Sequence, residues 1–192
     1  MREANRPNRR LTALMSLVAG GIFILGAGLI PLLVNAQQKA LASAAPIIPA
    51  TTANYPAPQL SLTDLQGKPA SLEDYAGKVI LVNNWATWCP PCKIEMPELQ
   101  AYYVSHAAEG FVVIAIESGE PADQVASFVK EYGMTFPVWL DPQSKAQGAL
   151  GNWDLPSSYV IDRDGIVRLS WTGGINQATL EEFVTPLLEA KK

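Results

Sequence analysis

The feature that most constrains the fold is a pair of cysteines placed just after a strongly apolar segment. Residues 79–85, VILVNNW, are apolar except for two asparagines, and the sequence Cys89-Pro-Pro-Cys92 follows closely. A short apolar run of this kind predicts a buried strand, and the stretch after the cysteines predicts a helix that ends near Gly110. The cysteines therefore lie where a strand passes into a helix.

This position favours redox chemistry. The dipole of a helix stabilises a thiolate at its N-terminus, so we expect Cys89 to attack and Cys92, one turn further in, to resolve the mixed disulfide. Pro90 and Pro91 lack backbone N–H groups, so the stabilisation of the thiolate should be moderate. The alternative is half of a zinc site, but a closed site needs four ligands, and the chain has two cysteines and one histidine.

Elsewhere the chain alternates strands with helices, which predicts a parallel core, and it ends in a hairpin and a helix. Asp162-Arg163-Asp164-Gly165 is a hairpin turn signal, and Pro186 can divide the last helix. The expected elements are a hairpin of 59–62 with a partner near 70, a capped helical turn from 71, strands at 79–85 and 111–117, a helix at 121–132, an antiparallel pair at 158–161 and 167–171, and a final amphipathic helix.

Two segments together carry a family resemblance. Residues 82–97, VNNWATWCPPCKIEMP, and residues 155–162, LPSSYVID, resemble the membrane-anchored thioredoxin-like proteins of the TlpA/ResA family, over about residues 57–190. The resemblance implies an α/β thioredoxin fold with an N-terminal β-hairpin, an inserted β-α unit and a mixed central sheet flanked by helices. It also implies thiol–disulfide exchange, commonly in the reducing direction, as in cytochrome c maturation.

Glu95 is the expected proton acceptor for Cys92. Asn83 holds the strand position that thioredoxin fills with a buried aspartate, and an amide does not titrate. Residues three apart share a helix face, which places Glu95 one turn beyond Cys92, and the family carries a glutamate here. A half-buried carboxylate there would have a raised pKa suited to a general base. The alternative is a solvated glutamate, as we expect for Glu98.

Pro156 matches a family proline that faces the disulfide through a cis peptide bond. Base rates alone favour a trans proline, because only about 5% of X-Pro bonds in folded proteins are cis. The backbone of Leu155 would then offer its N–H and C=O to an extended substrate segment. Trp88 should be partly exposed, beside Cys89. The expected substrate-binding residues are Trp88, Pro90, Pro91, Leu155 and Pro156.

Residues 11–34 carry no charge over 24 positions, and a helix of this length spans about 30 Å of hydrocarbon. Arginines before it, and only Lys39 just beyond it, predict a single-pass protein of the cell membrane with a cytoplasmic N-terminus and an extracytoplasmic body. A cleaved signal peptide is the alternative, since Val34-Asn35-Ala36 resembles a cleavage site, although such apolar regions usually run about 7 to 15 residues.

The expected organisation is a basic tail at 1–10, an anchor or uncleaved signal at 11–34, a linker rich in Ala, Pro and Thr at 35–58, and a thioredoxin-like domain at 59–192. The net charge is −4, but residues 1–10 carry +3 and residues 11–192 carry −7. An acidic body has no electrostatic footprint for nucleic acid, so we expect no nucleic-acid partner.

Three functions agree with two thiols at such a junction. The first is a thiol–disulfide oxidoreductase acting on protein disulfides. The second is a peroxiredoxin-like thiol peroxidase, whose usual motif has a threonine where Ala86 stands, and the third is a Cu(I)-binding metallochaperone. For the first we expect a monomer with no cofactor beyond the redox-active Cys89–Cys92 disulfide and no resident metal. Its partners would be protein disulfides, such as an apocytochrome c, and a membrane thiol-electron donor.

Overall fold

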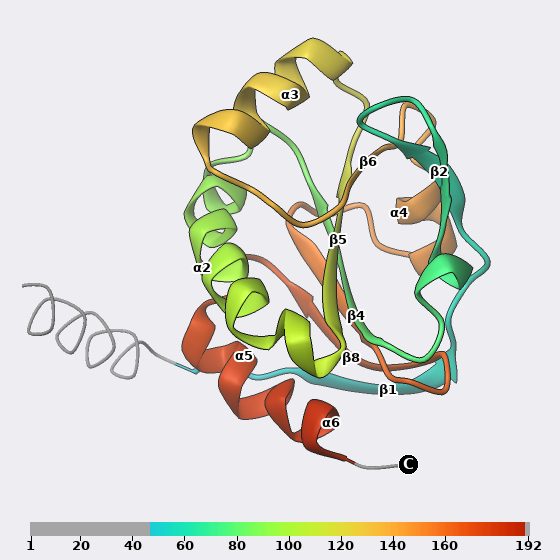
Figure 1. The fold of residues 1–192 in the computed structure, drawn as a ribbon, viewed down its shortest axis with the longest axis vertical. Helices are drawn as coiled ribbons and strands as arrows, with labels where there is room; N and C mark the ends of the chain where they lie inside the picture. Colours follow the sequence, from blue (N-terminus) through green and yellow to red (C-terminus); the bar gives the residue numbers. More distant parts are fainter. Residues whose placement is uncertain (1–46, 191–192) are drawn as a thin grey trace, which may run out of the picture. The chain divides into compact units, whose positions relative to one another are not determined.

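The computed structural model describes residues 47–190, in which eight strands form one mixed sheet with helices on both faces (Figure 1). The strand order is β1-β8-β7-β4-β5-β6-β2-β3; β4, β5 and β6 are parallel neighbours, and the other pairs are antiparallel. The elements are β1 (Thr51–Pro56), β2 (Ser61–Asp64), β3 (Pro69–Ser71), η1 (Leu72–Tyr75), β4 (Val79–Trp85), α2 (Pro90–His106), η2 (Ala107–Glu109), β5 (Phe111–Glu117), α3 (Ala122–Glu131), β6 (Val138–Leu140), α4 (Lys145–Leu150), β7 (Ser157–Ile161), β8 (Ile166–Thr172), α5 (Gln177–Phe183) and α6 (Thr185–Glu189).

Strand β4 lies at the centre of the sheet and is buried along its whole length. Successive side chains of a strand point to opposite faces, so Leu81, Asn83 and Trp85 face one side while Val82 and Asn84 face the other. A strand covered on both faces reads as a nearly continuous apolar run, which is why residues 79–85 are recognisable in the sequence.

The two faces of the sheet have separate cores. The core on one side is built from β4, β5 and the inner faces of α2, α3, α5 and α6, and it includes both cysteines. The other core lies under η1 and α4 and includes Trp139 and Tyr159. Figure 1 shows α2 and α3 on one side of the sheet and α4 on the opposite side.

The expected fold class is confirmed. Strands β2 and β3 form the first hairpin, and Ser71 and Asp74 form a capping box at η1. Strand β6 and helix α4 form the inserted β-α unit, which lies between α3 and the last hairpin, where β7 and β8 pair antiparallel. Pro186 lies in the first turn of α6, so the last helix is divided as predicted.

One boundary is wrong. The predicted linker at 35–58 contains β1, which pairs with β8 at the edge of the sheet. Just before it, the Ile48 N–H donates to Thr179 Oγ1 over 2.9 Å, and the Ile48 carbonyl accepts the indole N–H of Trp171 over 3.1 Å. An edge strand held mainly by backbone hydrogen bonds needs no apolar alternation, so a sequence rich in Ala, Pro and Thr concealed it.

Residues 1–46 lie outside the described part of the chain, and with them the predicted basic tail, the anchor at 11–34 and the start of the linker. Among the helices within residues 47–190, none is long and apolar enough to cross a membrane.

Candidate active site

The two cysteines form a disulfide at the start of α2. Cys89 is the N-cap of the helix, and the backbone N–H of Cys92 donates to its sulfur over 3.3 Å. Both residues are buried, with exposed fractions of 2% for Cys89 and 0% for Cys92. The sulfur of Cys89 therefore lies where the N–H groups of the first helical turn stabilise negative charge, as the sequence predicted.

Glu95 lies one turn after Cys92 and is almost completely buried, with 1% of its surface exposed. Its Oε1 accepts a hydrogen bond from Asn83 Nδ2 over 2.9 Å, and its Oε2 accepts one from the backbone N–H of Ile175 over 3.1 Å. Burial raises the pKa of Glu95 to about 8, and the two donors offset only part of this effect. The carboxyl group is thus more deeply buried than the half-buried position expected from the sequence.

Asn83 connects Glu95 to the last hairpin. Its Nδ2 also contacts Ser158 Oγ over 3.0 Å, while its Oδ1 is buried without a partner among the described residues. Asn83 Nδ2 thus contacts both α2, through Glu95, and the neighbouring strand β7, through Ser158. Asn83, a polar residue within an apolar strand, therefore forms part of the buried base of the cysteine site.

The loop before β7 carries the predicted proline. The Leu155–Pro156 peptide bond is cis, as the family resemblance implied. The Pro156 carbonyl accepts the N–H of Gly173 over 2.8 Å, and a Cβ placed on Gly174 would lie 3.5 Å from the carbonyl oxygen of Pro91. The glycine pair after β8 therefore lies between the proline loop and the start of α2.

Among the described residues, the N–H and C=O of Leu155 have no hydrogen-bond partner. The surface around the disulfide is otherwise apolar and open: Trp88 is 64% exposed, and Pro90 and Pro91 are exposed beside it. Of the five predicted substrate-binding residues, Trp88 precedes α2, Pro90 and Pro91 begin it, and Leu155 and Pro156 lie in the loop before β7. An unpaired backbone segment beside exposed apolar side chains is the kind of surface to which an extended peptide adds.

Sequence reasoning missed two carboxylates beside this site. Glu117 ends β5 and is fully buried, and both of its side-chain oxygens accept the backbone N–H of Glu120, over 3.1 and 3.0 Å. Glu120 in turn accepts hydrogen bonds from the backbone N–H of Thr87, over 2.6 Å, and from its hydroxyl. The only sequence signal was a glutamate at the end of the buried strand FVVIAIE.

One other expectation needs correction. Glu98 is not simply solvated, because its Oε2 accepts the backbone N–H of Gln177 over 3.0 Å at the start of α5. Further along α2, His106 has only 12% of its side chain exposed and contacts Glu109 and Glu181. Trp153, in contrast, is 65% exposed.

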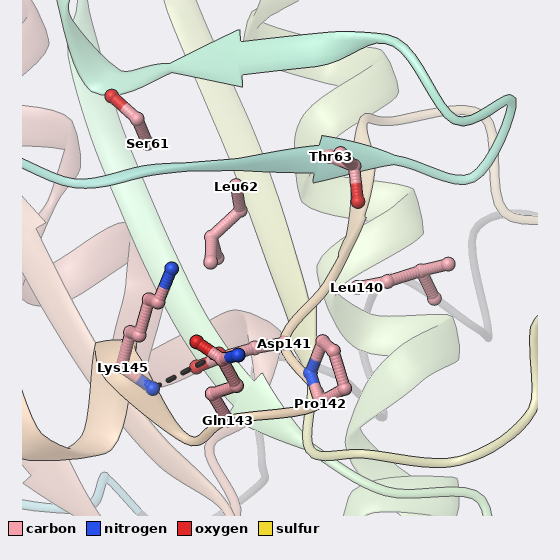
Figure 2. Close-up of a pocket in the computed structure, with 8 residues that line it drawn as sticks. All are labelled: Ser61, Leu62, Thr63, Leu140, Asp141, Pro142, Gln143 and Lys145. Carbon is pink, nitrogen blue, oxygen red and sulfur yellow. Dashed lines mark hydrogen bonds between the residues drawn. The ribbon is translucent and has the colours of Figure 1, made fainter.

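A pocket of about 260 Å³ lies away from the cysteines, between the first hairpin and the loop that follows β6 (Figure 2). Leu62 and Thr63 line one side, and Asp141 lines the other while it accepts the backbone N–H groups of Lys145 and Ala146. Asp141 therefore caps α4, which is a structural role. Within residues 47–190, no group of three or more His, Cys, Asp or Glu side chains is arranged to hold a metal ion.

A thioredoxin fold with a Cys-x-x-Cys disulfide at the N-terminus of its first long helix and a cis-proline just before β7 defines the class of thiol–disulfide oxidoreductases. The chain belongs to the AhpC/TSA family, which it matches over residues 53–170. Within this family it is a ResA-like protein of the thioredoxin type, as its relatives indicate.

Several relatives carry the name thiol-disulfide oxidoreductase ResA. The protein of Geobacillus thermodenitrificans is 35% identical over 128 residues, and that of Bacillus thuringiensis is 38% identical over 128 residues; each alignment covers 67% of this chain and 74% of the relative. Among solved structures, a thiol:disulfide interchange protein of the thioredoxin family from Chlorobium tepidum superposes with a TM-score of 0.65 at 31% identity, over 72% of this chain and 99% of that one. This chain is therefore a thiol–disulfide oxidoreductase.

Proposed function

We propose that this protein reduces disulfides in other proteins on the extracytoplasmic side of the cell membrane, with Cys89 as nucleophile and Cys92 as resolving thiol. The observation that carries the proposal is the disulfide at the N-terminus of α2, together with Leu155, which packs against the same core and has a backbone N–H and C=O without partners among the described residues. The location is supported by the uncharged run at 11–34 with arginines before it.

In the first step the Cys89 thiolate attacks one sulfur of the substrate disulfide. A sulfur–sulfur bond forms between Cys89 and the substrate, and the other substrate sulfur leaves as a thiolate that takes up a proton. Leu155 would hold the substrate segment by backbone pairing, and Trp88 would cover its apolar side chains.

In the second step Cys92 must lose its proton before it can attack Cys89 and release the reduced substrate. Glu95 is the proposed base, because it lies one turn away in the same buried environment. Asn83 and the N–H of Ile175 donate to its two oxygens, so both hold the carboxylate in place once it is charged.

The reverse proton transfer would occur when a thiol donor reduces the Cys89–Cys92 disulfide. The donor thiolate bonds to one sulfur, Cys92 leaves, and a second donor thiolate completes the reduction; two electrons and two protons reach the pair. With a pKa of about 8, Glu95 is mostly protonated near neutral pH in the oxidised protein. It can then protonate Cys92 as the bond opens.

The resemblance to the TlpA/ResA family points to an apocytochrome c among the substrates and to a membrane protein as thiol donor. A low-specificity site of exposed apolar residues and free backbone groups suits an unfolded chain such as an apoprotein. The two alternatives are a thiol peroxidase and a Cu(I) carrier, and the names of the relatives favour neither of them.

The proposal is tested by trapping the mixed disulfide with a disulfide-bonded protein substrate such as insulin. Cys92→Ser should accumulate a covalent adduct through Cys89 that dithiothreitol releases, whereas Cys89→Ser should trap none. Accumulation of the adduct by Cys89→Ser instead would assign the nucleophile to Cys92. An impermeant thiol reagent that fails to label the reduced protein in intact cells would contradict the extracytoplasmic location.

A further inference from the structure

A chain of hydrogen bonds leads from the buried carboxyl group of Glu117 to the turn that precedes Cys89. The Glu120 N–H donates to both oxygens of Glu117, and the Glu120 carboxylate accepts the N–H and the hydroxyl of Thr87. Two backbone contacts support the arrangement: the Ser118 N–H donates to the Trp85 carbonyl over 3.0 Å, and Trp85 pairs with Glu117 across the sheet.

We propose that Glu117 is a positioning residue for the active-site turn: it holds Glu120, and Glu120 holds Thr87 two residues before Cys89. Within the turn, residues 86–88, Ala86 is buried in the core, and the backbone hydrogen bond runs from the Cys89 N–H to the Ala86 carbonyl over 3.2 Å. The position of Cys89 therefore depends on a side chain from another strand as well as on its own helix.

The Glu117 and Glu120 side chains interact, and a hydrogen bond between their carboxyl groups needs a proton on one of the two, since two ionised carboxylates cannot form one. Burial, this hydrogen bond and the charge of Glu120 raise the pKa of Glu117 to about 7, although backbone N–H donors partly oppose the shift. In this proposal the Glu117 O–H donates to Glu120 below that pH, and repulsion between two carboxylates replaces the hydrogen bond above it.

Apart from Glu120, no charged side chain among the described residues accounts for the raised pKa of Glu117. In the sheet it is flanked by Trp85 on β4 and Leu140 on β6, neither of which is charged. Asp141 contacts it only through its backbone N–H, and its carboxylate caps α4. On α3, which packs on the same core, Asp123, Lys130 and Glu131 are exposed.

The inference rests on the proposed function in one respect: the position of the turn affects the reaction through Cys89, the proposed nucleophile. Its consequence is that the active-site turn is held more firmly below about pH 7 than above it. A loosened turn alters how the Cys89 sulfur is presented to a substrate, and misplacement of a reacting group lowers the rate.

The test measures hydrogen exchange of the Thr87 amide by NMR in the oxidised full-length protein, relative to the intrinsic exchange rate at each pH. Protection should fall by at least about fivefold between pH 6 and pH 8, because repulsion between the Glu117 and Glu120 carboxylates weakens the hydrogen bond that Glu120 accepts from the Thr87 N–H. In Glu117→Gln, whose amide can both accept from the Glu120 N–H and donate to its carboxylate, protection should stay high at both pH values.

Two further variants complete the experiment. Glu117→Ala should show low protection of Thr87 at both pH values, and Glu131→Gln, an exposed glutamate on α3, should behave as the parent. Equal pH dependence of Thr87 protection in the parent and in Glu117→Gln would overturn the proposal. Because no substrate or turnover is involved, this outcome is independent of whether Cys89 proves to be the nucleophile.

Discussion

Asn83 donates a hydrogen bond from Nδ2 to Oε1 of Glu95 over 2.9 Å, and both side chains are buried. The contact joins the central strand to the helix that carries the cysteines, 12 residues apart in sequence. A carboxylate so deeply buried is tolerable when it is neutral, or when its charge is satisfied by donors. Asn83 and the N–H of Ile175 supply these donors when Glu95 ionises.

An amide is well suited to a neighbour that gains and loses a proton. It offers an N–H to a carboxylate, and after rotation by half a turn it offers its oxygen to a protonated carboxyl. Asn83 can thus bond to Glu95 in both of its states, whereas a second carboxylate here would compete for the same proton. Thioredoxin has an aspartate at the strand position of Asn83. With asparagine there, the group that gains and loses a proton is Glu95 on the helix.

Glu95→Gln should slow the release of the mixed disulfide by about 10- to 100-fold at neutral pH, the usual contribution of a general base. In the parent this step should quicken as the pH rises towards 8, because Glu95 becomes ionised over that range. The variant should lack this part of the profile. Stopped-flow measurement of substrate release between pH 6 and 9 checks both expectations.

Glu98→Gln is the matched control on the same helix, since its amide oxygen can still accept the N–H of Gln177. It should leave the profile unchanged. If the two variants release substrate at the same rate and with the same pH dependence, Glu95 is not the base for Cys92.

The oxidised protein should become less stable as the pH rises from 5 to 8. The pKa of Glu95 is about 8 in the folded protein against an ordinary value of 4.5, so the unfolded chain loses its proton first. The contribution of Glu95 is fully present below about pH 4.5 and is lost as the pH rises through the folded-state pKa, by up to about 1.4 kcal/mol per pH unit. Urea unfolding at pH 5, 6.5 and 8 measures this slope, and Glu95→Gln should reduce it; an unchanged slope would refute the assignment.

Asn83→Leu should raise the pKa of Glu95 further, because it removes a donor that favours the carboxylate. The carboxyl carbon of Glu95, followed by NMR titration, reports this directly. Ser158→Ala removes the other partner of Asn83 without touching Glu95, so its effect on the titration should be much smaller. A lower or unchanged pKa in Asn83→Leu would show that Asn83 does not stabilise the anion.

Removal of β1 should destabilise the domain. A chain starting at Ala57 loses the edge strand and leaves the Trp171 indole N–H without its Ile48 acceptor, whereas a chain starting at Ala45 keeps both. Loss of the pairing and of this hydrogen bond should lower the melting temperature of the shorter chain by at least about 5 °C. Equal melting temperatures would mean that residues 45–56 act only as a linker.

The local elements of the fold could be predicted because each depends on residues close together in sequence. Strand β4 is recognisable by its apolar run, η1 by its capping pair, and the last hairpin by its turn residues. The cysteine pair was recognisable for the same reason, since the spacing of Cys89 and Cys92 and the strand before them are local features. The position of Glu95, one turn after Cys92 on the same helix face, could be predicted from helical periodicity.

What only the tertiary structure decided is which groups meet across the sheet and between loops. The N–H that Ile175 donates to Glu95 comes from 80 residues away, and Thr87 meets Glu120 across 33 residues. Edge strand β1 pairs with a strand more than a hundred residues further on. Such contacts leave no periodic pattern in the sequence, because each depends on where the folded chain returns. The sequence by itself therefore determined the chemistry of the thiol pair, while the folded structure decided the burial, the proton affinity and the positioning of the carboxyl groups around it.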